Sequence, residues 1–423
     1  MGKVVVTGIG IVAPNGIGID TYWRNLISGK SYIEKSDLME NLGFNSKVAS
    51  TIKNFNLEEY NVKKLFPSLE KEDKFVQYGV LSGKLSLDDS LLDYKNLKKE
   101  ECGVIFASAI GGTTSVAKTF EDLSDYGKSP ITYKPIGPNF YNSGMFNHSA
   151  SLLSKSYGFE GYCMSLSTGC TAGLDALGLG YEAIKNGEAS VMLVGSSEAP
   201  HVGFTYATLD IIGSLSVAEG DPSRASRPFD KKRAGFVIGE GASFLVLENE
   251  AHAIKRGAKI YGEITSFYSL SNAHHMTDLK ADGESMSEVI NRALTLGEVL
   301  PSNIDYINAH GSSTPQNDLF ETNAYKNVFG DRAYDIPISS TKSMIGHSLS
   351  SASLMGATSA LMSIKTSKIH PTINYEFEDE QCDLNYVPNH FVEKEVNTAL
   401  VTASGFGGIH SAAIFKKYGG IPL

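Results

Sequence analysis

Apolar residues along this chain follow two rhythms. Short, nearly continuous apolar runs predict strands buried on both faces, and they lie at residues 3–12, 102–107, 189–195, 243–247, 262–266, 304–309, 338–340, 399–403 and 411–415. Segments with apolar residues three and four positions apart predict helices, at residues 20–28, 75–92, 118–123, 143–157, 174–184, 284–295, 318–328 and 350–363. Strands alternate with helices, and the nearly continuous apolar run at 189–195 is typical of a parallel sheet covered on both faces, so we expect an α/β fold.

Two stretches break this pattern. Residues 31–75 are polar, mixed in charge and weakly periodic, so they predict an excursion from the main fold. Residues 126–139 contain three prolines and predict a loop.

The order of elements repeats at about half the chain length. A strand, a turn rich in Ser and Thr and a helix surround Cys170, and the same order surrounds Lys342 and His347. The apolar run at 191–196 likewise has a counterpart at 400–404. We therefore predict two similar α/β halves, residues 1–255 and 256–423, with a site where their strands end.

Composition excludes several classes of protein. The 423 residues carry a net charge of −10, which disfavours a nucleic-acid partner. We find no run of 18 apolar residues and no secretion signal at the start, so we expect no membrane span and a cytoplasmic location. The four cysteines are widely spaced without a CxxC pair, which favours a reducing compartment and gives no sign of a metal site.

A possible nucleotide motif near the start is rejected. Residues 8–13 match the dinucleotide pattern GxGxxA. That pattern requires a helix beginning inside it, and the sequence Pro14-Asn15-Gly16 would break such a helix. We therefore interpret the segment as a strand followed by a turn.

Cys170 stands at the centre of the most informative stretch, Ser165-Leu166-Ser167-Thr168-Gly169-Cys170-Thr171-Ala172-Gly173-Leu174. Its small neighbours leave room for a substrate, and the helix that follows would favour the thiolate through its dipole. Taken alone, a single cysteine is more often a small buried core residue.

Three further stretches rich in Gly, Ser and Thr each place a chemical group after a predicted strand. They carry His310, the pair Lys342 and His347, and Phe406 within the glycine run 405–408. Singly, these are a structural histidine, a solvated lysine and a tight turn. Together with Cys170 they supply a nucleophile, two imidazoles and backbone N–H donors, as acyl transfer requires. Asp318 and Glu321 lie three apart on the next predicted helix, where one of them could pair with Lys342.

These motifs, in this order and over nearly the whole chain, resemble the β-ketoacyl synthases of the thiolase superfamily. Finer wording is similar to the ketosynthase α-subunit of type II polyketide synthases; it includes Gly169 to Asp175, Asn272 to Thr277, Lys280 to Gly283, Cys382 to Pro388 and Ser404 to Ala412. The resemblance implies a five-layer αβαβα thiolase fold and a decarboxylative Claisen condensation.

By resemblance, Cys170 would carry the growing acyl chain, and His310 and His347 would assist loss of CO2 from a malonyl unit. The amides of Cys170 and Phe406 would hold the oxyanion, with Phe406 also gating the site. Lys342 would orient His347 and pair with Glu321. Ser312 and Thr314 would bind the phosphopantetheine arm of the substrate.

The resemblance also implies partners. An acyl carrier protein would deliver malonyl units on its phosphopantetheine, with no permanently bound cofactor. A chain length factor would complete a heterodimer, which we expect to form through residues 189–197. The loop at 66–74 is less basic than in many relatives, so the carrier-docking candidates are Lys63, Lys64, Lys128, Arg227, Lys231 and Arg233.

Three alternatives remain. A fatty-acid elongating β-ketoacyl synthase II would use the same chemistry. A chain length factor would be a structural partner, but Cys170 and both histidines are retained here. A cysteine hydrolase would use one histidine with a carboxylate, and the chain has no GxSxG elbow.

Overall fold

The computed structural model describes residues 2–133, 136–137 and 139–419. Its main sheet runs in the order β12–β11–β15–β16–β10–β1–β9–β7–β5–β6. The first half contributes β1 (Val4–Ala13), β5 (Cys102–Ala107), β6 (Cys163–Leu166), β7 (Val191–Glu198) and β9 (Gly241–Asn249). The second half contributes β10 (Gly262–Ser271), β11 (Tyr306–Asn308), β12 (Ile338–Ser339), β15 (Thr398–Gly405) and β16 (Ile409–Lys416).

The two halves have the same topology. Numbered within each half, the strands run 3–2–4–5–1 from the outer edge to the centre. In both halves the second strand is parallel to the third and fourth, and the fifth is antiparallel to its neighbours. The halves join where β1 pairs with β10 over Val4–Val6. This identity supports the predicted duplication, while the division at residues 255 and 256 stays a prediction.

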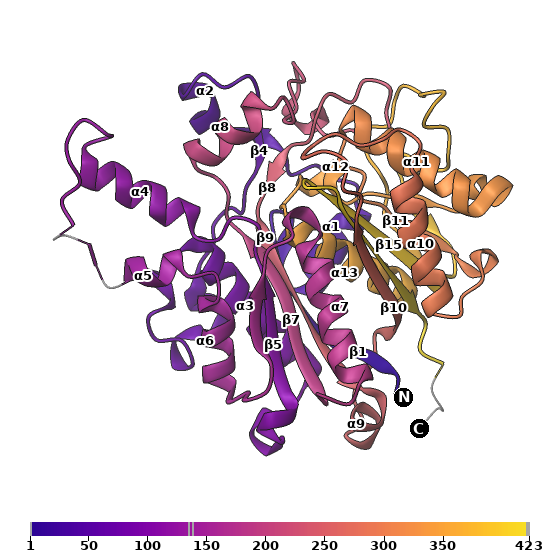
Figure 1. Ribbon diagram of the computed structural model, residues 1–423, viewed down its shortest axis with the longest axis horizontal. Helices are drawn as coiled ribbons and strands as arrows, with labels where there is room; N and C mark the ends of the chain where they lie inside the picture. The colour runs from indigo at the N-terminus through magenta and orange to yellow at the C-terminus, as the bar shows by residue number, and fades with distance from the viewer. Residues whose placement is uncertain (1, 134–135, 138, 420–423) are drawn as a thin grey trace.

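Helices form layers on both faces of the sheet (Figure 1). Helices α7 (Ala172–Lys185) and α13 (Ser351–Thr366) pack on each other and contact strands of both halves. Helices α3 (Lys74–Ser90) and α6 (His148–Tyr157) cover the outer face of the first half, and α10 (Glu284–Leu296) and α11 (Pro315–Phe329) that of the second. Because α7 and α13 lie between the two halves of the sheet, the layers run in the order helix, half-sheet, helix, half-sheet, helix.

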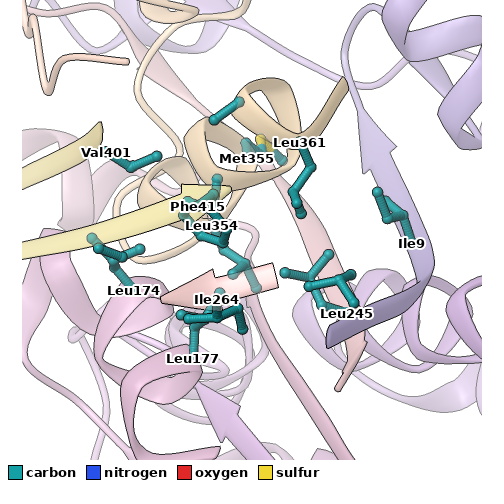
Figure 2. Close-up of a cluster of buried hydrophobic side chains, with 14 of the residues drawn as sticks. Ile9, Leu174, Leu177, Leu245, Ile264, Leu354, Met355, Leu361, Val401 and Phe415 are labelled. Carbon is teal, nitrogen blue, oxygen red and sulfur yellow. The ribbon is translucent and has the colours of Figure 1, made fainter. Parts of the chain in front are cut away.

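The largest hydrophobic core surrounds the two central helices. Figure 2 shows Leu174 and Leu177 of α7 among side chains of α13 and of strands from both halves. A helix that is apolar on nearly all sides must be buried in this way. Because these two helices are held in the core, the turns directly before them, which follow strands, are held in place as well.

The structure differs from the sequence predictions in several places. Helix α6 begins at His148 instead of residue 143, since Asn139–Gly144 forms a separate helix, α5. The segment 31–75 contributes β3 (Glu34–Lys35), α2 (Asp37–Asn41) and β4 (Val48–Ser50), and β4 pairs with β8 (Ile238–Gly239) in a small separate sheet. Two prolines of the predicted loop, Pro135 and Pro138, lie outside the described residues.

Helix α8 (Gly203–Ile211) was not predicted. Its Phe204 and Ile211 side chains are 66% and 85% exposed, so its apolar residues do not form one inward-facing stripe.

Strand β7 cannot form the predicted contact with a partner subunit at 189–197. It is hydrogen-bonded to β5 on one side and to β9 on the other, and every one of its residues is buried. The free edge of this half is β6, where Cys163 and Met164 are exposed. Among the described residues, no helix is long and apolar enough to cross a membrane.

Candidate active site

The turns that follow the strands enclose one cavity of about 560 Å³. Cys170, His310, His347 and Phe406 all line it. They come from four separate segments of the chain, two of which precede the central helices α7 and α13. The structure therefore brings together the four groups that the sequence suggested for acyl transfer.

Cys170 lies in a tight turn, Gly169–Thr171, directly before α7. Gly169 adopts φ +67°, a conformation that favours glycine. Burial raises the pKa of the Cys170 thiol to about 11, although the positive charge of Lys342 and the N–H groups of Phe406 and Cys170 lower it. The expected stabilisation of the thiolate at a helix start is thus outweighed by desolvation.

The two histidines face each other, with ring centroids 5.1 Å apart and ring planes at 79°. Both are buried, and burial together with nearby Lys342 holds their pKa values well below the usual value of 6.5. They are therefore neutral at physiological pH. In the described structure Nδ1 of each ring is buried without a hydrogen-bond partner.

Glu321 binds the backbone of the turn at His310 and Gly311. Its carboxylate accepts from the N–H groups of His310 (2.8 Å) and Gly311 (2.6 Å). Tyr325, Thr402 and Asn317 donate to the same carboxylate. This acid therefore fixes the turn that carries His310.

The predicted pairing of Lys342 with Glu321 is wrong as a direct contact. In the described part of the chain the ammonium group of Lys342 forms no ion pair and instead donates to the carbonyl oxygen of His310, at 2.5 Å. Glu321 is already satisfied by its own donors, so it acts on Lys342 only through its charge. Burial lowers the pKa of Lys342 to about 8, with Glu321 opposing the shift.

Ser312 and Thr314 line the same cavity, with their hydroxyl oxygens 2.8 Å apart. Phe406 is 39% exposed and stands in the turn between β15 and β16. Gly407 in that turn donates to the carbonyl oxygen of Met276 at 2.6 Å, so the loop at 272–279 rests against the glycine turn.

Two features of the site were missed from the sequence. Leu209 and the residue just after α8, Ile212, form part of the cavity wall. Glu198, at the end of β7, is a buried acid that accepts from Ser350 (2.5 Å) and from the N–H of Ala109. Burial raises the pKa of Glu198 to about 7, and its charge raises the pKa of Cys170. Neither feature belongs to a motif that could have signalled it.

Two of the expected docking residues are engaged inside the protein. Arg227 pairs with Asp230 and Glu376 and is only 9% exposed. The Arg233 side chain is 6% exposed and pairs with Asp379. Both are removed as carrier-docking candidates, whereas Lys231, three positions before Ala234 of the cavity wall in the sequence, is exposed.

Comparison with protein families decides the class of the chain. Residues 1–253 match the N-terminal domain of beta-ketoacyl synthases, and residues 261–376 match their C-terminal domain. The chain belongs to the beta-ketoacyl synthase family. The predicted activity class, an acyltransferase, is confirmed by this membership.

Among curated relatives, the ketoacyl synthase alpha subunit of the tetracenomycin polyketide synthase of Streptomyces glaucescens is 39% identical over 98% of this chain and 97% of its own length. A putative polyketide beta-ketoacyl synthase 1 of Streptomyces halstedii is 37% identical, over 97% of each chain. The 3-oxoacyl-[acyl-carrier-protein] synthase 2 of Coxiella burnetii is 34% identical over 98% of each chain.

Solved structures confirm the predicted thiolase-type fold. A type II polyketide synthase ketosynthase, in complex with its acyl-carrier protein and bound to a hexaketide, superposes with a TM-score of 0.93 at 38% identity, over 99% of each chain. The ishigamide ketosynthase/chain length factor superposes with a TM-score of 0.89 at 28% identity, over 99% of this chain and 100% of that one.

Proposed function

We propose that this beta-ketoacyl synthase is the ketosynthase α-subunit of a type II polyketide synthase. It would condense malonyl units with an acyl or polyketide chain held on Cys170. The observation that carries the proposal is the convergence of one cysteine and two neutral histidines on one cavity. The chain is 39% identical to the tetracenomycin ketoacyl synthase alpha subunit and 34% identical to the 3-oxoacyl-[acyl-carrier-protein] synthase 2, which favours the polyketide branch.

The first half-reaction loads the enzyme. The sulfur of Cys170 attacks the carbonyl carbon of an acyl thioester, and the C–S bond to the pantetheine sulfur breaks. The departing pantetheine sulfur takes up the proton that Cys170 loses, so the exchange is balanced. Since the thiol pKa of Cys170 is raised, this proton must be passed on during the attack.

The N–H groups of Cys170 and Phe406 are the donors for the oxyanion that forms in this step. Hydrogen bonding from both N–H groups lowers the pKa of the Cys170 thiol. Donors fixed in advance around a developing charge are a major source of catalysis. The exposed ring of Phe406 would gate access between loading and extension.

The second half-reaction extends the chain. Malonyl thioester loses CO2, and the electron pair of the broken bond forms an enolate. His310 and His347, as neutral imidazoles, donate hydrogen bonds to the thioester oxygen of this enolate. The enolate carbon then attacks the acyl carbonyl on Cys170. The C–S bond to Cys170 breaks, and the sulfur leaves as a thiolate that takes up a proton from solvent to restore the thiol.

Lys342 and Glu321 support this chemistry without contacting the substrate. Lys342 places a positive charge near Cys170 and donates a hydrogen bond to the His310 carbonyl. Glu321 accepts hydrogen bonds from the amides of His310 and Gly311. Both are positioning residues in this proposal.

The substrate would arrive on a phosphopantetheine arm, and the Ser312 and Thr314 hydroxyls in the cavity wall could bind its amide groups. An acyl carrier protein would deliver it, as in the similar ketosynthase complex. A chain length factor would complete a heterodimer at the free β6 edge, where Tyr162 and Met164 are 43% and 38% exposed. We place the enzyme in the cytoplasm.

Mass spectrometry of the intact protein tests the proposal. Incubation with an acyl-pantetheine thioester should add one acyl group, and digestion should locate it on Cys170. Cys170→Ala should abolish this addition and change the free energy of unfolding by about 1 kcal/mol or less, because the thiol and its neighbours are small. An acyl group on exposed Cys163 in the variant, or unchanged loading, would refute the assignment.

Extension assays separate the two branches. A polyketide synthase should extend malonyl units only with its partner subunit and leave the keto groups in place. A stable homodimer that elongates saturated acyl chains without a partner would instead identify a fatty-acid synthase.

A further inference from the structure

A buried acid beneath the nucleophile has no role in the mechanism above. Asp175 lies in the first turn of α7 and is 7% exposed. Its Oδ2 accepts from the hydroxyls of Thr171, at 2.8 Å, and Thr168. These two threonines flank Gly169 and Cys170, so one carboxylate oxygen holds both sides of the reactive turn.

The other oxygen of Asp175 reaches the second half of the chain. Its Oδ1 accepts from Ser411 on β16, at 2.5 Å. The hydroxyl of Ser411 also lies 3.1 Å from that of Ser269 on β10. Asp175 therefore forms hydrogen bonds both with the turn that carries Cys170 and with the hairpin β15–β16, whose turn carries Phe406.

The hairpin and the reactive turn are packed backbone against backbone. A Cβ atom added at Gly405 would lie 3.3 Å from the Cys170 nitrogen and 3.3 Å from the Thr168 oxygen. The two amides proposed to bind the oxyanion thus come from different halves of the chain and meet at this contact. Their spacing depends on how the two segments are held together.

Core packing alone does not account for an acid at this position. Burial of a carboxylate is costly, and here it raises the pKa of Asp175 above its ordinary value. An apolar side chain of similar size would fill the space without that cost. What the carboxylate adds is a set of directed bonds to three hydroxyls on two segments.

We infer that Asp175 is a positioning residue that keeps the amides of Cys170 and Phe406 in register as the two donors of one oxyanion site. The inference rests on the proposed function, in which those amides bind the oxyanion. Displacing one donor should slow each step that builds a negative oxygen at the thioester.

Two reactions of the same sulfur separate this role from a general structural one. Acyl loading forms an oxyanion, whereas alkylation by iodoacetamide displaces iodide from a saturated carbon and forms none. Asp175→Ala should lower the loading rate by about 10²–10³-fold. Alkylation of Cys170 should fall by no more than about tenfold, because the thiol stays buried beside Lys342 and loses at most one of the two N–H groups that lower its pKa.

Matched variants complete the experiment. Asp175→Asn should recover most of the loading rate, since the three hydroxyls can turn to serve an amide. Ser411→Ala, which cuts only the link to the hairpin, should lower loading by about tenfold. Ser266→Ala is the control, because Ser266 is a buried strand serine of the same half that donates instead to the Ala293 carbonyl.

Wild-type loading at Asp175→Ala, or an equal fall in loading and alkylation, would overturn the inference while leaving the proposed function intact. If Asp175→Ala does not fold, Ser411→Ala and Thr171→Val decide by the same two rates. A wild-type protein that never loads Cys170 would overturn the proposed function and this inference together.

Discussion

The reactivity of Cys170 is set by opposing charges in a desolvated place. Burial raises the pKa of its thiol, Lys342 lowers it and Glu198 raises it. The two residues that act on the sulfur through their charge come from opposite halves of the chain. Lys342 lies at the start of α12 (Lys342–Ile345), and Glu198 lies at the end of β7. Each can be neutralised separately.

Neutralising them should move the thiol pKa in opposite directions. Lys342→Met should slow alkylation of Cys170 by iodoacetamide at pH 7 by about tenfold for one unit of thiol pKa. Glu198→Gln should speed it by a similar factor only above pH 7, because the pKa of Glu198 is raised to about 7 and the wild-type acid is mostly charged only above that value. The deficit of Lys342→Met should shrink as pH rises through about 8, where the wild-type ammonium itself loses its proton. A stopped-flow pH series measures both effects, and shifts of the same sign in the two variants would contradict the charge balance.

The histidines should separate loading from decarboxylation. His310→Ala and His347→Ala should still load Cys170, because the first attack does not involve malonyl charge. Release of CO2 from malonyl-carrier protein should fall by about 10²–10³-fold for each lost donor. Wild-type CO2 release in both variants would make the histidines structural.

Sequence reasoning found the reactive residues because each stands in a glycine-rich turn after a strand. Helix spacing offered Asp318 and Glu321 as possible partners of Lys342, and the family resemblance selected Glu321. Spacing could not reveal that the Glu321 carboxylate already accepts from the His310 and Gly311 amides. Glu198 accepts from Ala109 and Ser350, 89 and 152 residues away in the chain, and the contact of Asp175 with Ser411 spans 236 residues, so no local pattern could reveal these contacts.

At the scale of elements, the long buried strands and helices were predictable, and short or exposed elements were not. Strand β1 and helix α7 have strong apolar patterns because β1 is buried along its whole length and α7 is buried except at Leu179, Glu182 and Lys185. Helix α8 exposes several of its apolar residues, so its pattern carries no period. Helix α8 contributes Leu209 to the cavity wall. Its position there follows from tertiary packing and not from a local sequence pattern.

The central helix α7 depends on close contact with the opposite half. A Cβ atom at Gly178 would lie 2.2 Å from the ring of Phe267 on β10. Gly178→Ala should therefore lower the free energy of unfolding by about 1–3 kcal/mol through overpacking. Adding Phe267→Leu should recover part of the loss in a double-mutant cycle measured by denaturant unfolding.

Gly144 supplies the control for this test. It lies at the end of helix α5, and a Cβ atom there would meet nothing within 4 Å. Gly144→Ala should leave stability unchanged or raise it by up to about 1 kcal/mol. Equal losses at the two glycines would argue against close packing as the cause.

At the scale of the whole molecule, a net charge of −10 repels an acidic carrier protein, so docking must depend on a local basic group. Lys231 is exposed and lies three positions before Ala234 of the cavity wall in the sequence. Lys231→Glu should raise the KM for malonyl-carrier protein by about fivefold at low salt, with little change in kcat. The KM for a free pantetheine thioester should not change.

Lys255 is the matched control, an exposed lysine on α9 (Glu250–Lys255), at the opposite end of the molecule from α8 (Figure 1). Lys255→Glu should leave both Michaelis constants unchanged. The effect of Lys231→Glu should fade by physiological salt, where the Debye length is about 8 Å. Loss of affinity that is equal in both variants would point to net charge and not to a docking site.

The position of β1 in the sheet has a consequence for synthesis of the protein. This strand is wholly buried, and its neighbours β9 and β10 begin at Gly241 and Gly262. A ribosome adding roughly 5–20 residues per second leaves residues 4–11 of β1 without a strand partner for roughly 10–50 s before β9 emerges, since only the end of β1 pairs with the adjacent residues 16–17. During that time an apolar strand with both edges free is exposed to other nascent chains. Chaperones must therefore keep this N-terminal segment from aggregating during synthesis. The yield of soluble protein on expression should depend on chaperone supply more than on the stability of the finished fold.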